Sequence, residues 1–449
     1  MDWDRLRETV SQSLNRKETL LALWSGDNSC HVATWRAGDT VRVSESAIGP
    51  GPFIRPSTYG YWGLWGLEEE APPGLWHGPR QRLRVTGRGT HLMPLGPVRA
   101  DVAESIRYEL AVFGDDIHGL RLYPGYKRRH VVQLMTGQSV DRALALAERI
   151  TGTSPVAHAW AFSQAVEDAW DLQVPEPAAQ FRTVLAELER LASHLGDLAL
   201  LASSTGTVTA AADLYRQKEA VLRFNALLTG HRYLRGFVSP GGIRRAPHAG
   251  SADLAAMLDA VEREFASIRQ ALERTNSFLD RLHGAGQIPA DQLSGLDLTG
   301  FVAKAAGMRA DLRWDRPYGA YGALVAEREP CRVTQPDAFG RYWVRAEEVA
   351  QSVQFLRRLA WPRTTDAQFL SAPVNREEPG VGYGLVEAPR GRLFYRIEAA
   401  GDTVRHAVID TASRRNWPAV PFAMAARNIM QDFPIIDASF ALAVSSLDL

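Results

Sequence analysis

Apolar residues recur at intervals of three and four residues through the middle of the chain, and this spacing predicts amphipathic helices. The stretch that follows Pro177 carries one such stripe, made of Leu185, Leu188, Ala192, Leu195 and Ala202. A similar stripe predicts a helix over 251–282, and a further helix is predicted over 212–228. Each is followed by a glycine that can end a helix, Gly284 and Gly230 respectively. Several long helices in succession indicate a bundle.

The start of another helix is predicted at Pro155, because proline is tolerated at the first helical position and Ser154, directly before it, can cap the helix. Strands are predicted on both sides of the helical region. Apolar residues alternate with polar ones over 104–123 around a Gly-Asp-Asp turn, which indicates a hairpin. A helix over 345–359 is followed by a second hairpin, with strands at 393–398 and 403–410.

The first 80 residues differ from the rest. Short β-favouring runs at 20–23, 32–35 and 41–43 precede a stretch rich in glycine, proline and tryptophan over 48–78. We therefore expect a small α/β module over 1–85. The remainder, 86–449, is expected to be an α+β domain with a β-rich start, a central bundle of long helices and a C-terminal β-hairpin region.

Composition narrows the function classes. A chain of 449 residues exceeds what one hydrophobic core usually supports. Lys+Arg and Asp+Glu both number 51, so no net charge recruits nucleic acid or an anionic membrane. The two cysteines, Cys30 and Cys331, cannot by themselves hold a zinc or iron–sulfur site. No apolar run approaches the roughly 20 residues of a membrane span, and acidic residues in Met1–Leu6 are unlike a signal peptide, so we expect a cytoplasmic chain.

Several motifs occur in a characteristic order. They are Glu148-Arg149-Ile150-Thr151-Gly152, Glu187-Leu188-Glu189-Arg190 with His194, Thr229-Gly230-His231-Arg232, Glu387-Ala388-Pro389-Arg390-Gly391 and Asp432-Phe433-Pro434. With this spacing, residues 90–449 resemble the large subunit of membrane-bound, energy-converting [NiFe]-hydrogenases and the homologous quinone-site (D-type) core subunit of respiratory complex I. The Tyr59–Leu67 stretch gives a weaker resemblance of the first module to the C-type subunit that is fused in front in some relatives.

The resemblance fails at the metal ligands. In the hydrogenases, two motifs supply four cysteines to the nickel–iron centre, and the matching residues here are Thr151, Ser154, Ala443 and Ser446. We refer to these as the four motif positions. Nickel and iron in that centre are held by soft, deprotonated sulfur, which alcohols and a methyl group cannot replace. We therefore expect no metal and no other cofactor bound by this chain, and no hydrogenase activity.

The contacts of a complex I quinone site are also altered. A histidine and a tyrosine that the resemblance would place at the quinone headgroup correspond to Arg99 and Gly152. A permanent cation at position 99 could hold an anion or a carbonyl oxygen, although a surface or interface arginine is the simpler interpretation. Quinone binding therefore stays possible, through changed contacts.

The remaining candidates each have a structural alternative. His158 is expected to face the cavity or to be a core histidine with one hydrogen bond. Arg390 is expected to border the cavity, unless it forms a structural ion pair with Glu387. Glu187, Arg190, His194 and Asp197 form a helical stripe that is either a solvated face or a buried supporting cluster. Gly382-Tyr383-Gly384 lacks the rest of a dinucleotide motif, so NAD would bind another subunit.

The function that the resemblance implies is that of a core subunit on the cytoplasmic face of a membrane-associated oxidoreductase. The implied partners are a small (B-type) subunit with a [4Fe-4S] cluster, further hydrophilic-arm subunits and antiporter-like membrane subunits. Electrons from the cluster would reach a metal-free cavity lined by the four motif positions with Arg99, His158 and Arg390, and their transfer would be coupled to ion translocation. The alternatives are a redox-inert scaffold in the same complex and a quinone reductase subunit of the NADH-quinone oxidoreductase type.

Overall fold

The computed structural model describes the strands at 18–25, 29–36 and 42–47 and the stretches 89–99, 104–293, 295–326, 328–359, 378–447 and 449. The first three strands, β1 (Glu18–Ser25), β2 (Ser29–Arg36) and β3 (Arg42–Ala47), form an antiparallel meander that overlaps each of the three predicted runs. The stretch over 48–78, including 59–67, and the proposed boundary at 85 lie outside the described residues.

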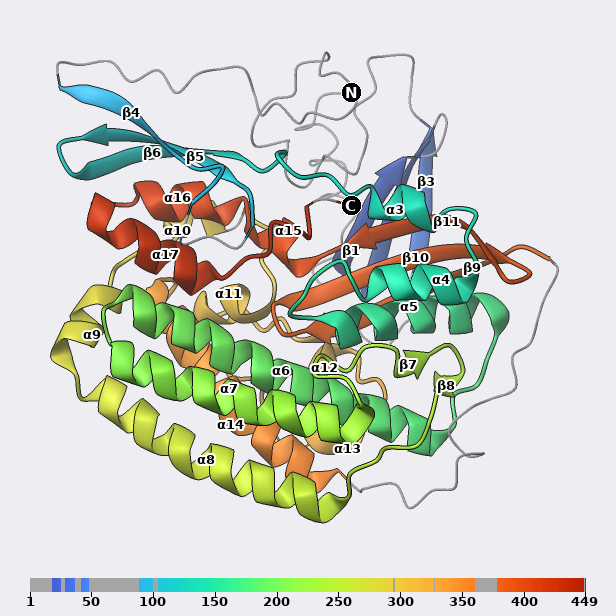
Figure 1. The fold of residues 1–449 in the computed structure, drawn as a ribbon. Helices are drawn as coiled ribbons and strands as arrows, with labels where there is room; N and C mark the ends of the chain where they lie inside the picture. The colour runs from blue at the N-terminus through green and yellow to red at the C-terminus, as the bar shows by residue number, and fades with distance from the viewer. Residues whose placement is uncertain are drawn as a thin grey trace.

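Long helices form the largest part of the molecule, as predicted. In Figure 1, α6 (Glu176–Ser204), α7 (Val208–Thr229) and α8 (Ser251–Glu273) lie side by side, and α14 (Ala338–Arg358) packs against α6 and α8. Gly230 ends α7 in the left-handed conformation expected of a C-terminal glycine.

Two helix boundaries differ from the predicted ones. The pattern over 251–282 is divided, because α8 ends at Glu273 and α9 (Asn276–Leu282) follows after a short break. The helix predicted from 345 begins at Ala338, where the Asp337 side chain accepts a hydrogen bond from the Gly340 amide. That aspartate cap was not recognised in the sequence.

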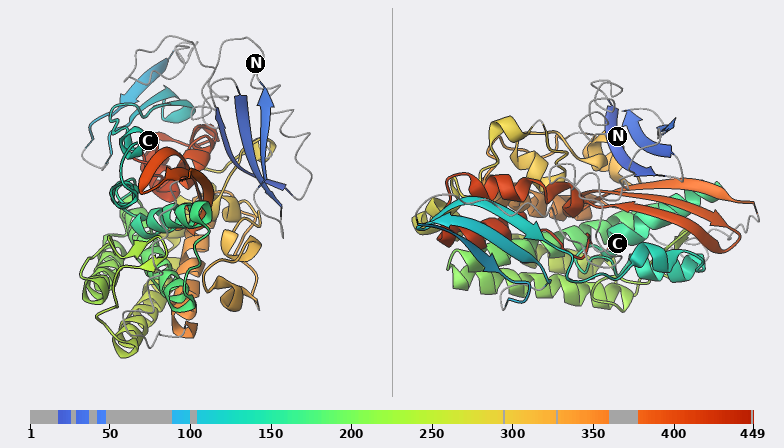
Figure 2. Two further views of the ribbon diagram at one scale, coloured as in Figure 1. Left: turned by 90° about the vertical axis from the view of Figure 1, so that its right-hand side faces the viewer. Right: turned by 90° about the horizontal axis from the view of Figure 1, so that it is seen from above.

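The bundle is flanked by two antiparallel sheets (Figures 1 and 2). One contains β4 (Thr90–Leu95), β5 (Arg107–Phe113) and β6 (Asp116–Tyr123), which includes the predicted hairpin. The other contains β9 (Gly380–Ala388), β10 (Gly391–Ala400) and β11 (Thr403–Asp410). The pairing of β10 with β11 confirms the second predicted hairpin, whereas β9 was not predicted.

Helix α5 (Pro155–Trp170) packs against β9 through very small residues. A side-chain carbon added at Gly382 or Gly384 would lie 2.0 Å or 1.8 Å from the carbonyl oxygens of Ala165 and Ala161. No residue larger than glycine fits there without moving the helix. The Gly382-Tyr383-Gly384 motif therefore has a packing role.

Shorter helices connect these parts: α3 (Val131–Met135), α4 (Val140–Ala147), α10 (Ala290–Leu293), α11 (Gly300–Ala305), α12 (Leu312–Asp315), α13 (Tyr321–Val325), α15 (Ala412–Asn416), α16 (Ala419–Ala425) and α17 (Phe433–Phe440). The two-residue strands β7 (Val238–Ser239) and β8 (Gly242–Ile243) pair with each other. Among the helices that the structure describes, none combines the length and the apolar character needed to cross a membrane.

Candidate functional site

The two segments that carry the four motif positions lie next to each other, although nearly 300 residues separate them in the chain. The hydroxyl oxygens of Thr151 and Ser446 are 2.9 Å apart and share a hydrogen bond. All four motif positions are buried. The structure thus brings together the first and last of the positions that the resemblance assigns to metal ligands.

Arg129 ties the two segments from one side. Its guanidinium donates to the carbonyl oxygens of Arg149 at 2.9 Å, Ile150 at 3.0 Å and Ser445 at 2.7 Å. No sequence motif indicated Arg129, because its long-range partners are backbone carbonyl oxygens. The Glu104 carboxylate adds a further link by accepting from the Ser445 amide at 2.8 Å.

Arg390 ties the segments from the other side, and the alternative of an ion pair with Glu387 is wrong. The guanidinium donates to the Thr153 hydroxyl, to the Ala441 carbonyl and, at 3.0 Å, to the Asp197 carboxylate of α6. Glu387 is not its partner. Two residues lie between Glu387 and Arg390 along the β9–β10 turn, and their side chains contact different neighbours.

Helix α5 begins directly after the first segment, at Pro155 as predicted, but a different residue caps it. Ser154 makes no capping hydrogen bond through its side chain. Instead the Glu189 carboxylate of α6 accepts from the amides of Val156 at 2.6 Å and Ala157 at 3.0 Å. Burial raises the pKa of Glu189 to about 8, even though both amide hydrogen bonds act to lower it.

His158 lies inside the core beside β10. Its Nδ1 shares a hydrogen bond of 2.7 Å with the Tyr395 hydroxyl, and the two rings meet edge to face. Burial, with a smaller contribution from Arg129, lowers the pKa of His158 to about 3. The imidazole is therefore neutral at physiological pH, as in the core-histidine alternative.

Arg99 belongs to a separate cluster near the β4–β5 connection. Its guanidinium lies 5.1 Å from the ring centres of both Tyr108 and Phe433 and 3.8 Å from the Asp437 carboxylate. The Tyr108 hydroxyl also donates to Asp437, at 2.9 Å. Position 99 is thus held against α17 by two aromatic rings and a carboxylate.

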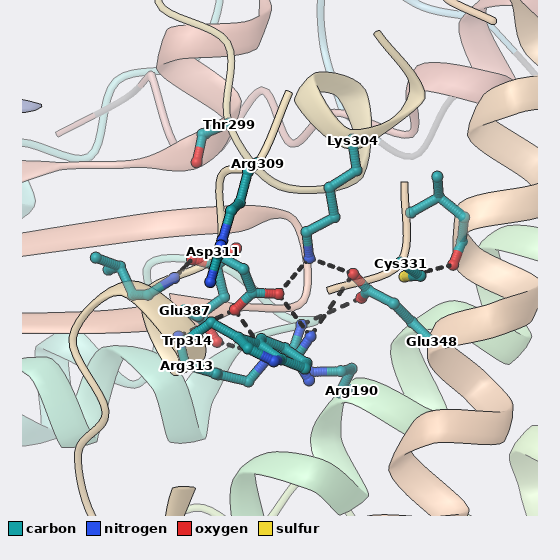
Figure 3. A network of polar contacts seen from close by, with 12 residues as sticks. Arg190, Thr299, Lys304, Arg309, Asp311, Arg313, Trp314, Cys331, Glu348 and Glu387 are labelled. Atoms are coloured by element: carbon teal, nitrogen blue, oxygen red, sulfur yellow. Dashed lines mark hydrogen bonds and ion pairs between the residues drawn. The ribbon is translucent and has the colours of Figure 1, made fainter. Parts of the chain in front are cut away.

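The stripe on α6 is buried and forms part of a large charged network (Figure 3). At its centre the Lys304 ammonium donates to Asp311 and to Glu348. Arg313 donates to Asp311 at 2.8 and 3.0 Å and to Glu187 at 3.2 Å. The solvated-face interpretation of the stripe is therefore wrong.

Arg190 joins the same network from α6. It lies 3.4 Å from both Glu187 and Glu348 and donates to the backbone carbonyls of Glu387 at 2.6 Å and Ala388 at 3.3 Å. The network therefore connects α6, α11, α12, α14 and the end of β9, the strand that leads to Arg390. Lys304 and Glu348 were not singled out in the sequence, because their spacing relates them to the α6 stripe only after folding.

The charges in the network balance. Burial acts to raise the pKa of Asp311, but the positive charges of Arg313 and Lys304 outweigh this effect and lower the pKa to about 2. Burial likewise opposes ionisation of Glu348, yet Lys304 and His194 keep its pKa well below the usual range. Three carboxylates (Glu187, Asp311 and Glu348) thus face three cations (Arg190, Lys304 and Arg313).

Two further groups in the network stay neutral. The His194 Nε2 shares a hydrogen bond of 2.6 Å with Glu348, and burial lowers the histidine pKa. Burial and the nearby Asp311 raise the pKa of Glu387 to about 8, and its Oε1 atom is buried without a hydrogen-bond partner in the described structure.

The four motif positions do not fit a nickel–iron centre. Such a centre needs thiolates, and these positions offer none. They offer the hydrogen-bonded hydroxyls of Thr151 and Ser446, the Ser154 hydroxyl and the Ala443 methyl group. Burial raises the pKa of the Cys331 thiol to about 12, so this sulfur stays protonated. Across the described residues, no three His, Cys, Asp or Glu side chains are grouped so that they could hold a metal ion.

Comparison with known proteins agrees with the resemblance drawn from the motifs. Residues 204–371 match the family described as respiratory-chain NADH dehydrogenase, 49 Kd subunit. A D-type subunit of the NADH-quinone oxidoreductase of Solibacter usitatus is 26% identical, covering 74% of this chain and 87% of that protein. The carbon monoxide-induced hydrogenase of Rhodospirillum rubrum is 25% identical, covering 77% and 96%.

The fold comparison extends over most of the chain. A subunit of the membrane-bound sulfane sulfur reductase, an archaeal respiratory membrane complex, superposes with a TM-score of 0.75 at 22% identity, covering 82% of this chain and 100% of that one. The predicted α+β architecture is therefore confirmed. The chain is a homologue of the 49 kDa, or D-type, subunits of NADH-quinone oxidoreductase and of a hydrogenase, as its motifs predicted.

Proposed function

We propose that this chain is a metal-free core subunit of a membrane-associated oxidoreductase complex. In this proposal it docks on the cytoplasmic side, receives electrons from the [4Fe-4S] cluster of a small partner subunit and couples their transfer to ion translocation by antiporter-like membrane subunits. Its relatives are oxidoreductase subunits, and the buried network would give the bundle two neutral, ionisable groups beside fixed charges.

The observation that carries the proposal is the hydrogen bond between Thr151 and Ser446. The two segments converge as in a protein that binds a metal between them, yet here the Thr151 and Ser446 side chains form a hydrogen bond with each other. Arg129 and Arg390 hold this arrangement from both sides. A fold that keeps the convergence without the sulfur ligands supports a role in a related complex with different redox chemistry.

The test uses the complex as the cell assembles it. The tagged chain is purified from solubilised membranes, its partners are identified by mass spectrometry, and nickel and iron are measured per chain. We expect a small iron–sulfur protein and antiporter-like membrane proteins, with iron but far less than one nickel per chain. Stoichiometric nickel would contradict the metal-free proposal, and a chain isolated without membrane partners would contradict its place in a complex.

A second experiment separates an electron-transfer role from the scaffold alternative. Arg99→Ala removes a motif-matched cation that lies beside two aromatic rings, whereas Arg99→Lys keeps a charge there. If the complex reduces an acceptor at this subunit, the alanine variant should assemble but lose turnover, and the lysine variant should keep part of it. Full turnover in both variants would favour the scaffold. Quinone-site inhibitors applied to the parent complex test the quinone reductase alternative.

A further inference from the structure

A small, half-open pocket lies between α6, α7 and the turn that carries Gly152 and Thr153. Its walls are mainly apolar and include Ala192, Leu222 and Leu234. Small-molecule sites are commonly concave and apolar with a few polar groups that fix the orientation of the ligand. The polar groups in this pocket therefore decide what it could hold.

Two polar atoms in the pocket wall lack partners. The Ser193 hydroxyl and the Asn225 carbonyl oxygen are buried, and neither has a hydrogen-bond partner among the described residues. Asn225 is fixed from its other end, where its amide nitrogen donates to the Arg232 carbonyl at 3.1 Å. Buried polar atoms are rarely left without a partner, so these two indicate a ligand or water in the pocket.

The pocket also contains a cation without a counter-ion. The Lys218 side chain extends over Gly196 so closely that a methyl group at position 196 would lie 2.7 Å from the ammonium nitrogen. In the described part of the chain, Lys218 takes part in no ion pair. The neighbouring Arg232, by contrast, binds both oxygens of Glu219.

The carboxylate in the pocket wall does not neutralise this cation. Glu189 uses both oxygens to accept from the first amides of α5, and its pKa of about 8 leaves it mainly protonated at neutral pH. Lys218 therefore remains a net positive charge in a mostly apolar pocket. An inorganic anion would satisfy the charge but leave the apolar walls uncovered.

We propose that this pocket binds a small organic anion, a monocarboxylate with an apolar body. Its carboxylate would accept hydrogen bonds from the Lys218 ammonium and the Ser193 hydroxyl, and its body would pack on Leu222 and Leu234. The proposal rests on the pocket residues alone and does not depend on the electron-transfer role.

Benzoate is a suitable probe, because it joins a carboxylate to a compact apolar ring, and benzamide is its uncharged counterpart. Both are titrated into the full chain by isothermal titration calorimetry. We expect benzoate to bind at least about 10-fold more tightly than benzamide, since a charge-assisted hydrogen bond is stronger than a neutral one. Failure of the parent chain to bind benzoate, or equal binding of the two probes, would overturn the proposal.

Three variants locate the site. Lys218→Met should weaken benzoate binding about 10-fold or more, and Lys218→Arg should restore part of it. Gly196→Ala should also weaken binding, because the added methyl group displaces the ammonium without removing its charge. As a control, Arg223→Met, which removes an exposed cation from the same helix, should bind like the parent chain. With folding verified by circular dichroism, unchanged binding in Lys218→Met would refute the assignment.

Discussion

Substituting Lys304 by methionine tests how strongly the buried charged network stabilises the folded chain. Lys304 is 1% exposed and bonds two carboxylates, Asp311 and Glu348, that are equally inaccessible. Methionine fills a similar volume but supplies no charge. The substitution would leave three carboxylates facing two arginines in a region where water cannot compensate.

The size of the effect follows from this imbalance. Removing one partner of a buried ion pair typically costs about 3–5 kcal/mol, since the remaining charge is left uncompensated. A chain of 449 residues has an unfolding entropy of about 0.9 kcal/mol/K, so this loss corresponds to a melting temperature lower by about 3–5 °C. Calorimetry of the purified chain at pH 7 measures the shift.

Arg216→Met is the matched control. Arg216 also pairs with two carboxylates, Glu264 and Asp213, but its side chain is 60% exposed. Exposed pairs contribute little, so this variant should melt close to the parent chain. In addition, Asp311→Asn should cost less in the Lys304→Met background than alone, because the surplus negative charge is then absent. If Lys304→Met melts like Arg216→Met, the buried charges do not hold the bundle together.

Three further changes test other parts of the structure. Gly384→Ala places a methyl group against the Ala161 carbonyl and should cost about 1–3 kcal/mol in thermal denaturation, whereas Gly322→Ala, which has space, should not. Glu387 binds its proton more tightly in the folded state, where its pKa is about 8 against 4.5, so the stability of the chain should fall as the pH rises from 4.5 to 8. Glu387→Gln should flatten this pH dependence in urea denaturation. An unchanged slope would assign the pH dependence to other groups. Arg129→Met should speed amide hydrogen exchange in residues 149–153 and 441–446, because it removes the hydrogen bonds that link these segments. The adjacent Arg128→Met should not. Equal exchange rates in the two variants would show that Arg129 does not link the segments.

The long helices and both predicted hairpins could be identified from the sequence because their signals are local. A 3/4-spaced apolar stripe defines α6 and α8, and alternation defines β5 and β6. Strand β9 gave no such signal. Its alternate glycines fit against alanines of α5, and this packing is visible only when both elements are in place.

The candidate site was predictable to a similar extent. Motif order indicated that the segments around Thr151 and Ser446 would meet, and the hydrogen bond between them agrees with this. Arg390 was a candidate, but its partner Asp197 is distant in sequence and was not assigned. Arg129 was missed, since it binds backbone carbonyls. Glu387 illustrates the same limit. Proximity in sequence suggested an ion pair, but the strand turn separates the two side chains.

The buried network and the four motif positions differ from the pocket in what they require of a ligand. Lys304, Asp311, Arg313 and Glu348 neutralise one another, so these charges need no bound counter-ion. Glu387 in the same network has a buried oxygen without a partner among the described residues, but its raised pKa of about 8 keeps the group neutral. The pair of Thr151 and Ser446 is likewise satisfied internally. The pocket beside Gly152, by contrast, combines an unpaired cation with buried polar atoms that lack partners among the described residues. If this chain binds a small molecule of its own, the physical argument therefore favours that pocket over the position of the lost metal.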